Sequence, residues 1–347
     1  MPIPFSTLAA NAAVKFNQAA HQTFALPLLI FFPTARCNSR CVSCDWWQAD
    51  GKSDLTLDEI RALTAQLPEL RTRLVLFSGG EPLLRREVFE IADLFRAQGV
   101  TLHLLTSGLF LDKYPDSIAA RFEQVTISLD AHTPTLYHSI RGVDALALVE
   151  RGVTRLRDCA PTLPIRARST LHRYNFGELP RLIDKAHAMG LAQISFLAAD
   201  VTSEAFGRRV ESSTRGLLLK ESEVKEFEQV VEETIRTHAR DFETRFVAES
   251  PEKLRRLPRY YAAQLGLGPF PTIACNAPWM SAVVEADGAV RPCFFHHAVG
   301  NIRDKGLGEI LRMEMVEFRR GLHVAENETC RKCVCTMQVG WRSRVWQ

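Results

Sequence analysis

The sequence lacks the features that would place a protein in a membrane or outside the cell. Its apolar run Leu26–Phe32 contains Pro27 and is far shorter than the roughly 20 residues that span a bilayer. The first 25 residues show no compact apolar core followed by a cleavage site. We therefore expect a cytoplasmic protein that is neither secreted nor inserted in a membrane.

The sequence also lacks a strong charge of one sign, internal repeats and low-complexity tracts. Its 43 Lys and Arg nearly balance its 40 Asp and Glu, which leaves a net charge of +3 over 347 residues. Because proteins that bind nucleic acids usually carry a clustered basic face, we expect no nucleic-acid partner. A hydrophobic content of 46% and a charged content of 24% are ordinary for a globular protein, and the length suffices for one large domain with a smaller appendage.

Cysteine, by contrast, is abundant, and it is grouped. The nine cysteines are Cys37, Cys41, Cys44, Cys159, Cys275, Cys293, Cys330, Cys333 and Cys335. Without a signal peptide a disulfide framework is unexpected, and the tight groups favour metal binding. Only Cys159 is isolated, and we expect it to be a small buried apolar residue.

Short apolar runs alternate with helical patterns between about residues 28 and 200. The expected strands are Leu28–Phe32, Leu74–Phe77, Thr101–Leu105, Val125–Leu129, Ile165–Thr170 and Gln193–Leu197. The expected helices lie near 54–67, 86–97, 116–122, 145–157 and 176–189. Strand–helix alternation predicts parallel strands joined by right-handed crossovers. Six such units predict an α/β fold, an open partial (β/α)6 barrel with its site at the carboxyl ends of the strands.

The pattern changes after Asp200, where a polar loop is expected at 203–219. Further helices are expected at 221–240, 255–264 and 307–319, and a β-hairpin around Asp287-Gly288. The sequence therefore divides into four parts. These are an N-terminal extension (1–25), a barrel core (26–202), a helical connecting region (203–269) and a C-terminal domain (270–347), which contains five of the nine cysteines.

The sharpest motif is Cys37-x3-Cys41-x2-Cys44, in the loop that leaves the first expected strand. Three thiolates on one short loop can bind three irons of a cubic cluster and leave the fourth open to a small molecule. Zinc is the alternative, but it would need a fourth nearby ligand, and the next histidine downstream is His103.

This spacing and position resemble the radical S-adenosylmethionine (SAM) superfamily. At the end of the next strand, Gly79, Gly80 and Glu81 resemble the family's motif for the methionine amino group of SAM. The glycines would allow close backbone approach, and a carboxylate suits an ammonium. The resemblance implies four further SAM contacts at later strand ends: Ser107, Ser128, Asp130 and Arg168. The family often has an aromatic residue where Ser43 stands, so Trp46 or Trp47 is expected to supply a stacking face or to lie in the core.

A second cysteine set, Cys275-x12-Gly288-x4-Cys293 followed by Cys330-x2-Cys333, resembles the auxiliary-cluster domain called twitch, a short relative of the SPASM domain. It implies one auxiliary 4Fe–4S cluster held by these four cysteines, with Cys335 a spare or alternative ligand. A structural zinc is the alternative, since four thiolates also suit zinc. His296 and His297, after the hairpin, are expected to face core and solvent and not to form a metal site.

The resemblance implies an enzyme with two 4Fe–4S clusters and SAM as cofactors, which cleaves SAM to a 5′-deoxyadenosyl radical. Its partners would be a flavodoxin- or ferredoxin-type electron donor and a small-molecule substrate, or a peptide. The leading hypothesis is oxidative modification of a small metabolite in a biosynthetic pathway. The alternatives are a peptide maturase that forms a cross-link or epimer, aminocarboxypropyl transfer from SAM, and a non-catalytic iron–sulfur or zinc scaffold. No leader-peptide-binding domain is expected in the short N-terminal segment, and the sequence identifies neither substrate, reductant nor oligomeric state.

Overall fold

The structure, a computed structural model, describes residues 5–208, 216–341 and 343. The expected polar loop at 203–219 therefore lies partly outside the described residues. The chain forms two compact units, each assembled from separate stretches of sequence. The first takes in 1–37, 48–104 and 273–347, and the second takes in 38–47 and 105–272.

The first unit is built on a sheet with the strand order β3-β2-β1-β7-β8-β9. Its strands are β1 (Leu28–Phe31), β2 (Leu74–Phe77), β3 (Thr101–Thr106), β7 (Ser281–Val284), β8 (Ala289–Arg291) and β9 (Gly300–Asn301). Strands β1, β2, β3 and β7 pair in parallel, whereas β8 and β9 add antiparallel pairs at the edge. The expected C-terminal hairpin is present, and it extends the same sheet as the first strand instead of forming a separate one.

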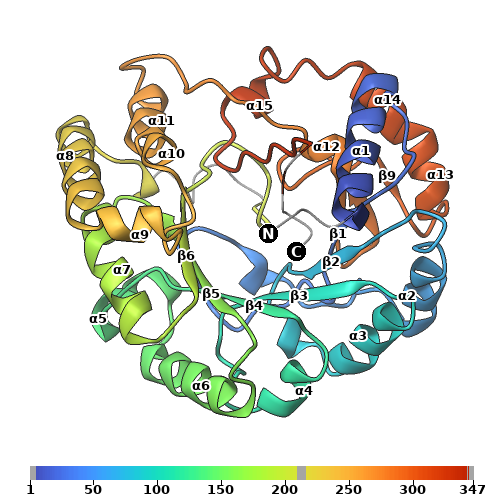
Figure 1. Cartoon of the computed structure of the whole chain (residues 1–347), viewed down its shortest axis with the longest axis horizontal. Helices are drawn as coiled ribbons and strands as arrows, with labels where there is room; N and C mark the ends of the chain where they lie inside the picture. The colour runs from blue at the N-terminus through green and yellow to red at the C-terminus, as the bar shows by residue number, and fades with distance from the viewer. Residues whose placement is uncertain (1–4, 209–215, 342, 344–347) are drawn as a thin grey trace. The chain divides into compact units, whose positions relative to one another are not determined.

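Strand β1 is completely buried because it has a sheet neighbour on each side and side chains packed on both faces. Three phenylalanine rings fix helix α3 (Val88–Arg96) against β1 and β2, with centroid separations of 5.6 Å for Phe31–Phe77, 4.9 Å for Phe31–Phe95 and 5.5 Å for Phe77–Phe95. Figure 1 shows α3 on the outer side of these strands. The cluster of rings makes α3 and the strands one rigid body on which the following loops are built.

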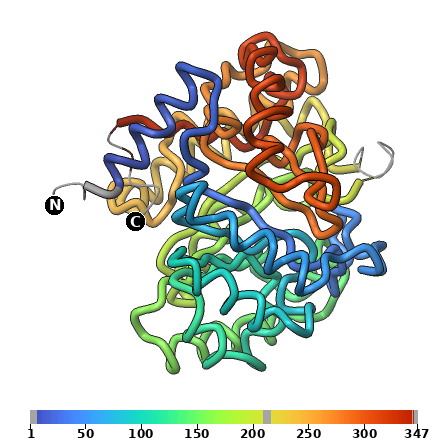
Figure 2. The backbone as a smooth tube through the Cα atoms, turned by 90° about the vertical axis from the view of Figure 1, so that its right-hand side faces the viewer, coloured from blue at the N-terminus to red at the C-terminus, as the bar shows by residue number. Residues whose placement is uncertain are grey.

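The other helices of the first unit come from both ends of the chain. They are α1 (Phe5–Ala20), α2 (Leu57–Thr64), η2 (Pro82–Leu84), α12 (Ala277–Met280), α13 (Leu307–Arg312), α14 (Glu314–Arg320) and α15 (Glu328–Arg331). Helix α1 was not expected from the sequence. Buried Asn17 of α1 donates to the Trp279 carbonyl at 2.7 Å, and Asn11 donates to the Trp341 carbonyl at 2.9 Å. Figure 2 shows this blue helix beside the red C-terminal segment that it binds.

The second unit contains the parallel strands β4 (Gln124–Ser128), β5 (Ile165–Leu171) and β6 (Gln193–Ala198). Its helices are α4 (Pro115–Ala119), α5 (Pro134–Arg141), α6 (Leu146–Cys159), η3 (Phe176–Glu178), α7 (Leu179–Ala188), α8 (Glu221–Thr237), α9 (Ala239–Glu243), α10 (Pro251–Leu254) and α11 (Arg256–Gln264). Burial alternates along β5, so one face packs under the helices and the other is partly exposed. Helices α6 and α7 lie outside these strands (Figure 1).

The six expected strands are confirmed to within one or two residues, and the α/β class with an open, largely parallel sheet is confirmed as well. Two long helices were predicted wrongly as single elements: one is interrupted at His238 and the other at Met313. Helix α5 was missed. Cys159 was expected to be buried, but it is exposed at the end of α6, where its thiol donates to Asp116 at 3.1 Å.

Candidate functional site

The Gly79-Gly80-Glu81 motif is attached by its backbone to the chain segment that leads into Cys37. Because Phe31 of β1 and Phe77 of β2 are register partners, the segments that follow both strands leave the same edge of the sheet. The hydrogen-bond ladder continues beyond the strands. The Gly80 amide donates to the Thr34 carbonyl at 3.2 Å, and the Glu81 amide donates to the Arg36 carbonyl at 2.8 Å. The predicted SAM motif and the start of the cluster loop are therefore one structure.

Both glycines of the motif are required by that close approach. Gly79 has a φ of +98°, and a Cβ there would lie 2.7 Å from the Phe32 side chain. At Gly80 a Cβ would overlap the Arg36 carbonyl oxygen and lie 2.6 Å from that of Ala35. A side chain at Gly79 would displace Phe32 and one at Gly80 would displace backbone, so the sequence motif has a steric cause in this fold.

Glu81 is completely buried, and its carboxylate accepts a hydrogen bond from the Leu83 amide at 3.1 Å as the N-cap of η2. This contact fixes the orientation of the carboxylate at the end of β2. The role of Glu81 toward the SAM ammonium stays a prediction, and the cap shows how the side chain would be held for it.

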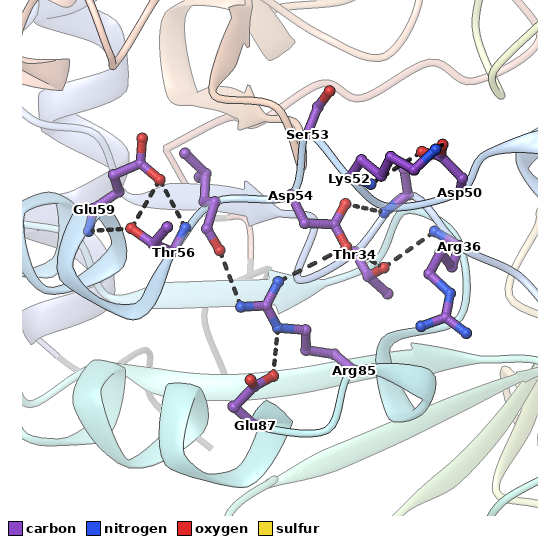
Figure 3. A network of polar contacts seen from close by, with 12 residues as sticks. Thr34, Arg36, Asp50, Lys52, Ser53, Asp54, Thr56, Glu59, Arg85 and Glu87 are labelled. Carbon is purple, nitrogen blue, oxygen red and sulfur yellow. Dashed lines mark hydrogen bonds and ion pairs between the residues drawn. The ribbon is translucent and has the colours of Figure 1, made fainter.

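A partly buried ion pair supports this edge of the first unit (Figure 3). Asp54 accepts hydrogen bonds from the Thr34 hydroxyl at 2.5 Å and from the Ala35 amide at 3.0 Å. Arg85, which follows η2, lies 3.7 Å from the same carboxylate and bonds to Glu87 at 2.8 Å. The pair thus connects the start of the cluster loop to the segment that follows Glu81, a connection that the sequence analysis missed.

In the second unit, Cys41 and Cys44 lie on a loop that the end of helix α5 supports. The Arg40 amide donates to the Arg141 carbonyl at 2.9 Å, and the Val42 amide donates to the Ile140 carbonyl at 3.0 Å. Helix α5 ends at Gly142, whose φ of +68° is left-handed and whose added Cβ would lie 2.7 Å from the Arg40 carbonyl. Only glycine therefore allows the loop to lie this close to the helix end.

A second segment holds the same loop at its other end. The Asp45 amide donates to the Phe206 carbonyl at 2.9 Å, and Trp46 of η1 (Trp46–Gln48) packs against Gly207. This segment is fixed by a buried ion pair of 2.8 Å between Arg208 and Asp200. Trp46 therefore packs against backbone, and its predicted role beside adenine stays a prediction.

The charge around Cys41 favours a thiolate. The hydrogen bond with Cys44 lowers the pKa of the Cys41 thiol to about 7, and Arg141 adds to this against the opposing effects of burial and Asp130. Burial lowers the pKa of Arg141, but the negative charges of Cys41 and Asp130 outweigh it and hold that pKa well above its usual range. Among the residues that the structure describes, none forms a hydrogen bond with the buried Nε of Arg141. An unpaired buried donor beside a thiolate fits an anionic cluster.

The remaining predicted SAM contacts also lie in the second unit. Ser128 and Arg168 are register partners on β4 and β5, and Arg168 donates to Ser195 of β6 at 3.3 Å. Asp130 has both carboxylate oxygens bound by protein groups, one by the Thr170 amide at 2.7 Å and the other by Arg141 at 3.0 Å. Ser107 is buried. The SAM-binding roles of these residues stay predictions.

The C-terminal cysteines converge on one open pocket of about 620 Å³ in the first unit. Cys275, Cys293, Cys330 and Cys333 line it, and Cys335 lines it too. Their role as cluster ligands stays a prediction. Burial raises the pKa of Cys293 to about 11 and that of Cys330 to about 12, and the neighbouring thiols add to both shifts. Such thiols are protonated near pH 7 unless a metal displaces the proton. A set of four or five converging thiols fits an iron–sulfur cluster.

Of the two adjacent histidines, His297 is exposed and His296 is buried beside this pocket, as expected. The His296 Nε2 lies 3.3 Å from the Cys330 sulfur. Burial lowers the pKa of His296 to about 4, so the ring is neutral near pH 7. Sequence analysis did not place His296 at the cysteines, and no spacing rule would have done so.

Within 5–208, 216–341 and 343, no three Cys, His, Asp or Glu side chains are placed to bind a single metal ion as they stand. No helix in those ranges is long and apolar enough to cross a membrane.

Two family models match this chain, and they match the two parts that carry the cysteine motifs. Residues 31–186 match the radical SAM superfamily, and residues 275–334 match SPASM, an iron–sulfur cluster-binding domain. The chain therefore contains a radical SAM domain followed by a C-terminal SPASM domain, which is the domain content of a radical SAM enzyme. The two domains imply 4Fe–4S clusters and SAM as cofactors.

Particular relatives span most of the chain. Fe-coproporphyrin III synthase of Methanosarcina barkeri is 25% identical over 342 residues, which covers 88% of this chain and 80% of that protein. Among solved structures, Streptococcus suis SuiB bound to its precursor peptide SuiA matches 95% of this chain and 76% of its own with a TM-score of 0.65 at 14% identity. The structure of anSMEcpe with bound AdoMet and a peptide matches 88% of both chains with a TM-score of 0.62 at 19% identity. These two likenesses establish the fold alone.

Proposed function

We propose that this enzyme oxidises a small metabolite, with SAM and a SAM-binding cluster in its radical SAM domain and one auxiliary cluster in its C-terminal pocket. The observation that carries the proposal is the pocket itself, which is lined by five cysteines from three separate segments of the sequence. When bound, the first cluster supplies the electron that cleaves SAM to a 5′-deoxyadenosyl radical, and the second supplies an acceptor for an electron from the substrate.

Different residues would hold the first cluster, SAM and the auxiliary cluster. Cys37, Cys41 and Cys44 would hold the first cluster, and Arg141 would balance its negative charge beside Cys41. Gly79, Gly80 and Glu81 would hold the methionine end of SAM, with Glu81 oriented by its bond to Leu83. Cys275, Cys293, Cys330 and Cys333 would hold the auxiliary cluster, and the apolar pocket walls would keep water from it.

A small-molecule substrate is favoured by the relative that spans both domains. The name of that relative, Fe-coproporphyrin III synthase, makes an iron tetrapyrrole the first compound to test. The peptide-bound structures share only the fold, so a peptide substrate is the alternative outcome of the same experiment. We further propose a flavodoxin- or ferredoxin-type protein as the electron donor.

The test begins with anaerobic reconstitution, in which two 4Fe–4S clusters give about eight irons per chain. Reduced protein with SAM should then release 5′-deoxyadenosine, and more of it when the correct substrate is present. Iron tetrapyrroles and a panel of short peptides are compared by substrate-dependent 5′-deoxyadenosine and by the mass of the product. Zinc in place of iron, or modification of a peptide alone, would contradict the proposal.

A further inference from the structure

We propose that His296 sets the reduction potential of the auxiliary cluster, by donating a hydrogen bond from Nε2–H to the sulfur of Cys330. The inference deepens the proposed function and rests on it, because it requires that the C-terminal thiols hold a cluster.

The contact is short and buried. His296 follows β8 and Cys330 lies on α15, so the two residues are 34 positions apart and meet only through folding. The Nε2 to sulfur separation of 3.3 Å is within the range of a hydrogen bond to sulfur. The exposed fractions are 6% for His296 and 9% for Cys330, so water competes little for either group.

The imidazole is held in this orientation from two other sides. The Phe318 ring of α14 packs against it edge-on, with centroids 4.8 Å apart at 70°. Arg291 of β8 donates to the His296 carbonyl at 3.0 Å, which fixes the backbone. Because packing on one side and a backbone bond on the other leave the ring little freedom, its tip stays directed at the Cys330 sulfur.

The direction of the hydrogen bond follows from the chemistry of the two groups. A cluster-bound cysteine sulfur is a thiolate without a proton, so the histidine nitrogen must be the donor. Donation withdraws negative charge from a ligand sulfur, which stabilises the more negative, reduced form of the cluster. Hydrogen bonds to ligand sulfurs are among the known determinants of iron–sulfur potentials. The bond therefore makes the auxiliary cluster a better electron acceptor, which net oxidation of a substrate requires.

The test measures the potential of the auxiliary cluster alone. In full-length protein, Cys37, Cys41 and Cys44 are replaced together by Ala, so that only the auxiliary site holds iron. Potentials are read by redox titration with EPR detection for this protein and for His296→Leu, His296→Gln and His297→Leu made in it. Leucine retains apolar packing against Phe318 without a donor, glutamine retains a donor, and His297 is the exposed neighbour on the same loop.

We expect His296→Leu to keep about four irons and to lower the midpoint potential. A tenfold loss in the one-electron reduction equilibrium corresponds to about 59 mV, and we expect a shift of at least this size. His296→Gln should have a midpoint potential close to that of the parent protein, because glutamine retains a donor. His297→Leu should show no shift in potential. If the leucine variant does not retain its cluster, His296→Asn, a polar side chain too short to reach the sulfur, provides the same comparison.

Other outcomes separate the two proposals. A parent protein without iron at the auxiliary site would overturn the proposed function. A loaded leucine variant with the parent's potential would overturn the role of His296 and leave the proposed function standing. An equal shift in the leucine and glutamine variants would also overturn it. So would a histidine nitrogen coupling in pulsed EPR that is as strong as direct ligation to iron gives, because His296 would then be a ligand.

Discussion

Arg141 and Asp130 form a buried ion pair, with 3.0 Å between Nη1 and Oδ2, directly beside the loop that carries Cys41. Arg141 supports that loop in two ways. Its carbonyl accepts the Arg40 amide, and its guanidinium charge stabilises the Cys41 thiolate. One residue at the end of α5 therefore connects the end of β4 with the cluster loop.

Removing one member of this pair should be costly. Arg141→Met leaves Asp130 buried without its partner, and breaking a buried pair in this way typically costs about 3–5 kcal/mol. Urea unfolding would measure the free energy of the single variants and of Arg141→Met combined with Asp130→Leu. We expect the double variant to lose less free energy of unfolding than the two single variants lose in sum. Simple additivity would mean that the two charges do not stabilise one another.

Gly80→Ala should weaken SAM binding. The added methyl would collide with the Arg36 carbonyl, so the start of the cluster loop and the Glu81 segment must separate. Gly268→Ala is the matched control, since no atom of the described residues lies within 4 Å of a Cβ at that position. SAM affinity by equilibrium dialysis checks the prediction, with a loss of at least about tenfold, or 1.4 kcal/mol, expected for Gly80→Ala only. Equal affinities in the two variants would mean that the loop tolerates the separation.

Glu81→Ala should leave iron content nearly intact but weaken SAM binding and slow its cleavage. The alanine removes both the charge proposed for the SAM ammonium and the acceptor for Leu83. Glu81→Gln retains that acceptor and removes only the charge. We expect the glutamine variant to bind SAM almost as poorly as the alanine variant does. The measurements are SAM affinity and 5′-deoxyadenosine formation under dithionite. Native affinity in the glutamine variant would leave Glu81 with a capping role alone.

The auxiliary ligands can be separated from the fifth thiol of the pocket by iron analysis. Replacing Cys275 and Cys293 by Ala should halve the iron of the reconstituted protein, from about eight to about four, and leave some SAM cleavage without substrate turnover. Cys335→Ala should keep all eight irons because four other cysteines remain in the pocket. Exposed Cys159→Ala is the control for the loss of one thiol. Thermal unfolding checks that the variants stay folded, and iron loss in Cys335→Ala would make Cys335 a ligand.

The ion pair between Glu59 and Arg303, at 2.6 Å, predicts an acid-dependent stability. The hydrogen bond from Arg303 lowers the pKa of Glu59 from 4.5 to about 2, and the bond from the Thr56 amide adds to this. Because the folded-state pKa is below the unfolded one, the contribution is complete above pH 4.5 and is lost as the pH falls toward 2.

Both side chains are about one-third exposed, so the contribution should be below about 1 kcal/mol. Glu59→Gln should therefore have a lower urea midpoint than the native protein at pH 7. The two midpoints should become equal near pH 2. Glu228→Gln, on the exposed face of α8, is the control. A pH-independent difference between Glu59→Gln and the native protein would contradict the assignment.

The sequence by itself determined the class of this protein. Three cysteines at fixed spacing on one loop need no tertiary structure to be brought together, and Gly79-Gly80-Glu81 follows the next strand in a regular alternation. The strands were predictable because short parallel strands that are buried on both faces consist of continuous apolar runs, as in β1. Helix α5 was missed because its three buried residues, Tyr137, Ile140 and Arg141, include a charged one, which a search for apolar periodicity rejects.

Only the tertiary structure decided which residues support the site. Arg141, Asp54, Arg85 and His296 are charged or polar residues of kinds that usually lie on the surface. Nothing near them in sequence marks Arg141 and His296 as buried, or Asp54 and Arg85 as partly buried. Each of them contacts a partner that is not adjacent in the sequence. His296 contacts Cys330, for example, and Asp54 contacts Thr34. Folding creates these pairs because a buried polar group must find a partner, and the partner available depends on which strands and helices meet there.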